Sequence, residues 1–171
     1  VAAIGLADDL WSGPERGFRA HLGSGVTTGT LKLVGIPLYA LLRTRSLSGS
    51  LLVGLAANAV NQLDTRPGRA LKAFGLGALL VGGVPKRALA TAVLLAPYDL
   101  REMGMLGDGG SNALGAVLGF SSVERLTGWR RWSAIGALSL LTVAGERRSL
   151  GAVIEATPVL RDVDRLGRDH S

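Results

Sequence analysis

Ser46-Leu-Ser-Gly-Ser-Leu-Leu-Val-Gly-Leu-Ala-Ala-Asn-Ala-Val-Asn-Gln-Leu63 is a run of 18 residues that carries no charged side chain. This length reaches what a membrane-spanning helix needs. Asn58, Asn61 and Asp64 follow one another at helical spacing, so the two amides and the carboxylate share one face. Such groups are costly to bury unless they bind one another or a ligand. The stretch therefore predicts a spanning helix that ends in a binding site or, alternatively, in a polar seam between packed helices.

Shorter apolar runs flank this stretch on both sides, at residues 30–42, 70–84, 88–96, 109–123 and 132–145. Neither strand alternation nor a βαβ rhythm is visible. The mean hydropathy is +0.33, 19% of residues are charged and 25 of 171 are glycine, a composition that suits close packing of membrane helices. We therefore predict an all-α fold, a multi-span transmembrane helical bundle, in which flanking basic residues lengthen the shorter runs by snorkelling. A soluble helical bundle is the alternative.

Residues 1–171 are expected to form one integral-membrane domain, of which residues 146–171 are a polar, basic tail with an amphipathic segment. The chain begins within an apolar phrase, Val1 to Ala7, so we expect an N-terminally truncated sequence with further spans upstream. Trp129 and Trp132 stand at the start of the last apolar run. Because tryptophan is enriched where membrane meets water, we predict that both lie at that interface.

The charge pattern limits the classes of partner. The formal net charge is +6, but the basic residues are scattered singly and in pairs without interleaved aromatic residues. This pattern does not favour nucleic-acid binding, and it favours an anionic membrane surface or phosphorylated substrates. The chain has no cysteine, which excludes a disulfide framework and a thiolate metal site.

A second polar motif, Gly107-Asp-Gly-Gly-Ser-Asn112, precedes the apolar run that starts at Ala113. Glycines let the backbone turn sharply and approach a ligand closely. A carboxylate held between them suits Mg²⁺, which takes oxygen ligands and usually keeps substrate phosphates in its shell. We therefore predict that Asp108 lies in a turn that binds a metal–phosphate complex, the alternative being an ordinary polar turn between two helices.

A third acidic motif, Asp8-Asp9, follows the N-terminal apolar phrase. Two adjacent carboxylates repel each other, so a folded protein exposes them, pairs them with cations or places them on a metal. The alternative interpretation is a solvated helix end.

The number of crossings brings the three acidic motifs together. If the apolar runs are spans, two of them separate Asp9 from Asp64 and two more separate Asp64 from Asp108, so all three lie on one face. Of the 13 acidic residues only Glu124 falls on the opposite face, together with seven of the 19 basic residues. The count of Lys and Arg modestly favours a cytoplasmic motif face, and hence cytoplasmic catalytic loops.

The motifs in this order resemble those of the polyprenyl-phosphate N-acetylhexosamine-1-phosphate transferases, in particular a short branch of that family. The likeness rests on Asp8-Asp9, Gly25-Val-Thr-Thr-Gly-Thr-Leu-Lys32, Asn58-Ala-Val-Asn-Gln-Leu-Asp64 and Gly107-Asp-Gly-Gly-Ser111. Family members are bacterial multi-pass membrane enzymes of cell-envelope glycan synthesis. The resemblance implies transfer of a sugar 1-phosphate from a UDP-sugar to a polyprenyl phosphate with release of UMP.

The resemblance also implies roles for individual residues. It gives Asp8, Asp9, Asp64 and Asp108 catalytic roles, with Asp108, Asp64 and Asn61 as ligands of Mg²⁺, for which Mn²⁺ is an alternative. Residues implied in substrate binding are Lys32, Asn58, Asn61, Arg69 and Ser111. The implied partners are the UDP-sugar, the lipid phosphate, the membrane and a second copy in a homodimer, with no nucleic acid.

The chain also departs from the family pattern. Pro67 stands where many members carry a second aspartate after Asp64, and the only histidines are His21 and His170, so the histidine-rich loop of many members is absent. The identity of the transferred sugar therefore stays open. Two other functions stay open as well, namely a non-catalytic membrane homologue and a Mg²⁺-dependent phosphohydrolase.

Overall fold

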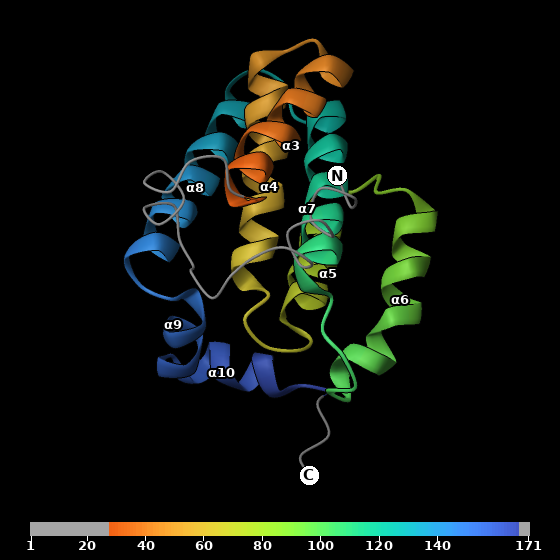
Figure 1. The fold of residues 1–171 in the computed structure, drawn as a ribbon, viewed down its shortest axis with the longest axis vertical. Helices are drawn as coiled ribbons and strands as arrows, with labels where there is room; N and C mark the ends of the chain where they lie inside the picture. Colours follow the sequence, from red (N-terminus) through yellow and green to blue (C-terminus); the bar gives the residue numbers. More distant parts are fainter. Residues whose placement is uncertain (1–27, 168–171) are drawn as a thin grey trace.

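The computed structural model describes residues 28–167, with side chains from residue 34 onward, and all of its regular structure is helical. Figure 1 shows the helices arranged as a bundle with two short helices across one end. In chain order the helices are α3 (Thr28–Thr44), α4 (Leu47–Leu63), α5 (Arg69–Val81), α6 (Lys86–Leu100), α7 (Gly107–Arg125), α8 (Gly128–Arg147), α9 (Leu150–Ala156) and α10 (Pro158–Arg165). The predicted all-α class is confirmed for this part of the chain.

The charge-free stretch forms α4, which is the central helix of the bundle. Ser46 begins it as N-cap, with extended backbone and its Oγ accepting from the Gly49 N–H at 3.2 Å. Helices α3, α5, α7 and α8 all pack against α4. Asp64 follows the last residue of α4 as C-cap, so the polar end of the stretch lies where α4 turns into α5.

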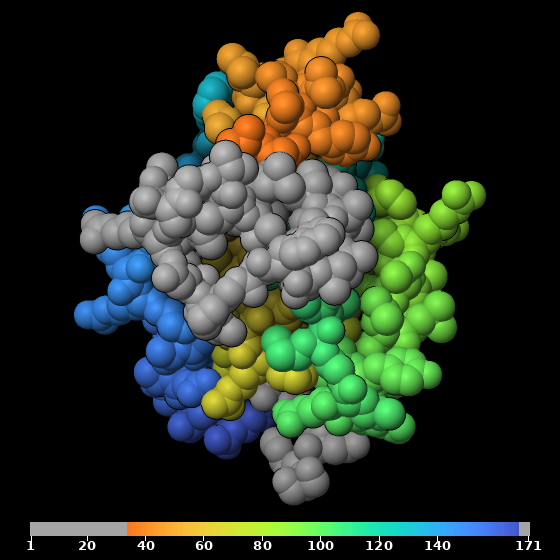
Figure 2. Space-filling view, viewed as in Figure 1, coloured from red at the N-terminus to blue at the C-terminus, as the bar shows by residue number. Residues whose placement is uncertain are grey.

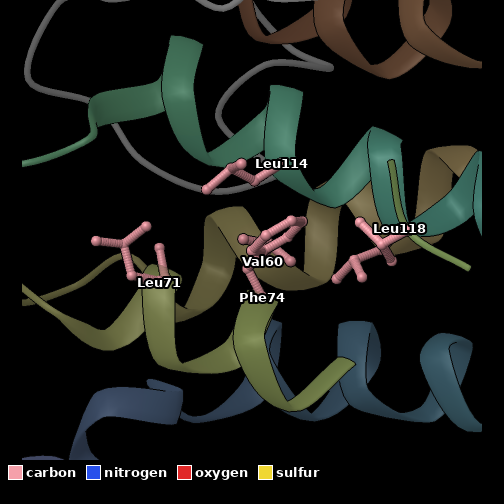
Figure 3. Close-up of a cluster of buried hydrophobic side chains, with 7 residues drawn as sticks. Val60, Leu71, Phe74, Leu114 and Leu118 are labelled. Atoms are coloured by element: carbon pink, nitrogen blue, oxygen red, sulfur yellow. The ribbon is translucent and has the colours of Figure 1, made fainter. Parts of the chain in front are cut away.

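Two apolar clusters surround α4. The first joins Val60 of α4 to Leu71 and Phe74 of α5 and to Leu114 and Leu118 of α7, and Figure 3 shows these side chains filling the space between the three helices. The second joins α3, α4 and α7 through small and medium side chains, namely Ile36, Ala40, Val53, Ala57 and Ala116. The core therefore consists of the faces that α3, α5 and α7 turn toward α4.

Glycines allow α7 to approach α4 closely. A β-carbon on Gly115 would stand 2.6 Å from Ala57 Cα, and one on Gly119 would stand 2.5 Å from Val53 Cα. Both distances are shorter than any real contact of a β-carbon. The glycines therefore let the two backbones touch. The two contacts also show that α7 runs antiparallel to α4. From Gly115 to Gly119 the contact advances along α7, while on α4 it goes back from Ala57 to Val53.

One sequence prediction about local structure was wrong. Asp108 does not lie in a turn between helices, because α7 begins at Gly107 and holds Asp108 in its first turn. The side chains of Ser111 and Asn112 donate to the carbonyls of Gly107 and Asp108, one helical turn earlier. Helix α6 continues through Pro97 to Leu100.

In the part of the chain that the structure describes, no helix combines the length and the apolar character required to cross a membrane.

Candidate functional site

Two of the predicted motifs meet where α4 ends and α7 begins. Ser111 Oγ lies 2.8 Å from Asn61 Oδ1 and also 2.8 Å from Gly107 O, so its hydroxyl proton has two acceptors. Ser111 is fully buried. The side chain of Asn112, also buried, donates to Asp108 O at 2.7 Å. Ser111 thus links the first turn of α7 to α4, and Asn112 stabilises that turn from within the helix.

The antiparallel register places Asp64 and Asp108 at the same end of the α4–α7 pair. Asn61 contacts Ser111, and Ala57 contacts Gly115 one turn further along both helices. Asp64 follows α4 directly, and Asp108 lies in the first turn of α7. The amino-terminal end of a helix carries partial positive charge and unpaired N–H groups. This end of the pair therefore combines two carboxylates with a helix terminus that can bind an anion.

Asn58 points to a different neighbour. Its Nδ2 donates to Thr142 Oγ1 of α8 at 3.1 Å, and Gln62 Nε2 donates to Thr142 O at 3.3 Å. The predicted polar face of α4 is therefore divided between α7 and α8. This contact of Asn58 is the packing seam that the alternative interpretation expected, and its role in substrate binding stays a prediction.

Arg69, predicted to bind substrate, lies at the start of α5 and is 4% exposed. Its Nε and Nη2 donate to the two carboxylate oxygens of Asp164 at 3.0 and 2.9 Å. Nη2 also lies 3.2 Å from Glu155 Oε1, and Nη1 donates to Thr65 Oγ1 at 2.7 Å. In this structure the guanidinium thus holds the C-terminal helices α9 and α10.

Asp99 is a buried carboxylate at this end that the sequence analysis missed. It is 3% exposed, and its Oδ2 accepts from the Gly68 N–H at 2.9 Å. Gly68 has φ +84, a conformation that favours glycine, and it begins α5 after the Asp64–Gly68 turn. A signal was present, since Asp99 is the only charged residue between Arg87 and Arg101. A lone charge in an apolar helix calls for a partner.

A cavity of about 270 Å³ lies between the end of α6 and the start of α7. Its walls are mostly apolar, and Asp99 supplies its one carboxylate. The lining residues are Leu95, Tyr98, Asp99, Gly104, Met105, Leu106 and Gly110. The cavity therefore opens beside the first turn of α7.

The remaining predicted site residues lie largely outside the described part of the chain. Asp8 and Asp9 precede it, and Lys32 belongs to α3 but its side chain is not described. Within residues 28–167, no three His, Cys, Asp or Glu side chains gather in a group that could hold a metal ion. Mg²⁺ is often bound by only one or two carboxylates plus substrate phosphates. The donor chemistry of Asp64 and Asp108 fits such an open site.

No family model matches this chain, and neither a curated protein nor a solved structure matches it. The family resemblance therefore rests on the motifs of the sequence alone.

Proposed function

We propose that this chain is a membrane-embedded transferase of the bacterial cell envelope that moves N-acetylhexosamine 1-phosphate from a UDP-sugar to a polyprenyl phosphate. The observation that carries the proposal is the 2.8 Å contact between Ser111 Oγ and Asn61 Oδ1. It joins two motifs that are 50 residues apart, each with an aspartate three residues from the contact. A helix-packing seam needs the amide and the hydroxyl, but it does not need two carboxylates at the same end.

The chemistry of phosphoryl transfer suits this arrangement. The reaction needs positioning and neutralisation of charge more than it needs covalent help from the protein. Asp64 and Asp108 would hold Mg²⁺, which supplies neutralisation of the diphosphate charge when it is bound. The N–H groups at the start of α7 would face the same phosphates. Lys32, Asp8 and Asp9 enter the proposal only through the family resemblance.

The distribution of apolar side chains supports a membrane setting. Along α6, Ala88, Ala92 and Ala96 pack against the core, whereas Val93 and Leu94 are exposed. In Figure 2, α6 lies along one edge of the molecule and its side chains form part of the outer surface. On α5, Leu79 and Leu80 are 84% and 78% exposed. On α6, small residues face the core and large apolar residues face outward, an arrangement typical of helices surrounded by lipid.

A labelled-transfer assay tests the proposed function. Membranes containing the chain would receive UDP-N-acetylglucosamine with a radiolabelled sugar, undecaprenyl phosphate and Mg²⁺, with other UDP-sugars in parallel. We expect label in the lipid fraction, one UMP released for each sugar transferred, and loss of both signals with EDTA. Label that stays in the aqueous phase with every UDP-sugar would contradict the proposal. Release of inorganic phosphate instead of UMP would favour a phosphohydrolase.

A further inference from the structure

The Asp64–Gly68 turn is held by the C-terminal part of the chain. Figure 1 shows α9 and α10 lying across the end of the bundle where α4 turns into α5. The contact is made mainly by polar groups, because the apolar residues Val159 and Val163 of α10 are exposed whereas Asp164 is 7% exposed. Asp164, and not the apolar residues of α10, therefore faces the bundle.

Arg69 and Asp164 form the centre of this contact. The two N···O distances of 3.0 and 2.9 Å describe a bidentate pair between residues 95 positions apart. Lys72 adds a second link, because its Nζ lies 3.3 Å from Val163 O and also donates to Asp164 O at the carboxyl end of α10. A cation at that end of a helix is favourable. Arg69 and Lys72 thus bind one end of one short helix.

Arg69 also forms a hydrogen bond to the Asp64–Gly68 turn. Its Nη1 donates to Thr65 Oγ1 at 2.7 Å, and Thr65 directly follows Asp64. Gly151 of α9 covers the pair, since a β-carbon there would stand 2.7 Å from Arg69 Nη1 and 2.8 Å from Thr65 Oγ1. Arg69 and Asp164 are therefore enclosed by protein, whereas Thr65 lies at the exposed edge of the contact.

The ion pair between Arg69 and Asp164 is buried, so breaking it costs free energy. Removing one partner of a buried ion pair leaves the other charge without compensation in a poorly solvated place, which is strongly unfavourable. By contrast, the Arg66–Glu155 pair at 3.2 Å is about half exposed and contributes little. A contact that only docks the tail loosely would not need a fully buried guanidinium.

We infer that Asp164 is a positioning residue for Asp64, acting through Arg69 and Thr65. The inference rests on the proposed function, in which Asp64 helps to hold Mg²⁺ and the diphosphate. When Arg69 loses its carboxylate partner, it no longer fixes Thr65, and the turn that carries Asp64 samples more conformations. The C-terminal helices are thus a structural part of the site even though they carry none of its motifs.

The test compares Asp164→Asn with Asp162→Asn in the full chain. Asp162 lies on the same helix, but its side chain is 72% exposed and lies 3.9 Å from Arg161, so it is a matched control. Hydrogen exchange of the amides of residues 64–69 should become about tenfold faster in Asp164→Asn and stay unchanged in Asp162→Asn. Exchange in the middle of α7 should not change in either variant.

Transfer assays add a second measurement, the Mg²⁺ requirement, which a change in stability alone would not alter. In Asp164→Asn we expect the Mg²⁺ concentration for half-maximal transfer to rise several-fold, with part of the activity restored by excess Mg²⁺ and most of it by Asp164→Glu. Thr65→Val keeps the buried ion pair and should also raise the Mg²⁺ requirement. This variant therefore tests the inference if Asp164→Asn does not fold.

Equal exchange of the turn in the two aspartate variants, or in Thr65→Val and the unchanged chain, would overturn the inference. Faster exchange in a chain that shows no transfer with any UDP-sugar would leave the positioning role intact and reject the proposed function. The two failures are therefore distinguishable.

Discussion

Gly115 of α7 lies so close to Ala57 of α4 that a β-carbon on the glycine would stand 2.6 Å from the alanine Cα. This approach sets the distance between the two helices that carry Asp64 and Asp108. A side chain at position 115 would push α7 away and stretch the contact between Ser111 and Asn61 one turn further along. The packing of a single glycine thus bears directly on the candidate site.

Gly115→Ala should lower the free energy of unfolding by roughly 1–3 kcal/mol, because the added methyl group meets backbone atoms that cannot move aside. Gly136→Ala is the control, since a β-carbon there meets nothing within 4 Å and position 136 is an exposed place in α8. That variant should leave stability unchanged or raise it by up to about 1 kcal/mol. Thermal unfolding in one detergent measures both, and equal midpoints would contradict the packing described.

The contact between Asn61 and Ser111 should appear as an interaction energy in a double-mutant cycle. With Asn61→Ala, Ser111→Ala and the double variant, we expect a coupling of about 1 kcal/mol, because each single change leaves the other group without that partner. Ser133→Ala on the exposed side of α8 should show no coupling with Asn61→Ala. Additive effects of the first pair would mean that the side chains do not meet in solution.

Asp64→Asn and Asp108→Asn should each lower Mg²⁺-dependent transfer by on the order of 100-fold or more, because each removes a carboxylate charge that would hold Mg²⁺ on the diphosphate. The expected fold is unchanged, as judged by circular dichroism. Glu124→Gln is the matched control, because Glu124 lies on α7 at the end opposite Asp108 and should retain full activity. Normal transfer by Asp108→Asn would remove Asp108 from the proposed site.

Trp129 and Trp132, which are 73% and 61% exposed, should report on the membrane. After the third tryptophan, Trp11, is replaced by phenylalanine, vesicles should shift the fluorescence emission to shorter wavelength. Lipids brominated near the headgroup should quench it more than lipids brominated near the chain end, since tryptophan prefers the interface. Emission that does not respond to vesicles would contradict the predicted interfacial position.

The helices themselves were largely predictable from the sequence. The charge-free stretch from Ser46 to Leu63 became α4, with Ser46 as its cap. The turn between α4 and α5 contains the Pro67-Gly68 pair, and proline and glycine favour the backbone angles found in turns. The predicted turn at Asp108 was wrong, since α7 begins at Gly107 and its side chains at positions 111 and 112 donate to the carbonyls of its first turn.

The candidate site was predictable only in part. The sequence singled out Asn61, Asp64, Asp108 and Ser111, and the structure brings Asn61 and Ser111 into contact. The contact between Asn58 and Thr142 could not be predicted from the sequence, because the two residues are 84 positions apart and no local pattern links them. The two acidic partners of Arg69 lie 86 and 95 residues away along the chain. Its buried ion pair could therefore not be predicted from the sequence either.

By itself the sequence determined that residues 28–167 are helical, where most of the longer helices begin and end, and that polar motifs stand at their ends. These features depend on composition and on spacing within a few turns, which are local properties of the chain. Only the tertiary structure decided which helix faces meet, that glycines bring α4 and α7 into contact, and that Asp164 takes the guanidinium of Arg69. Such contacts depend on the path of the whole chain, because their energy is gained only when distant groups are buried together.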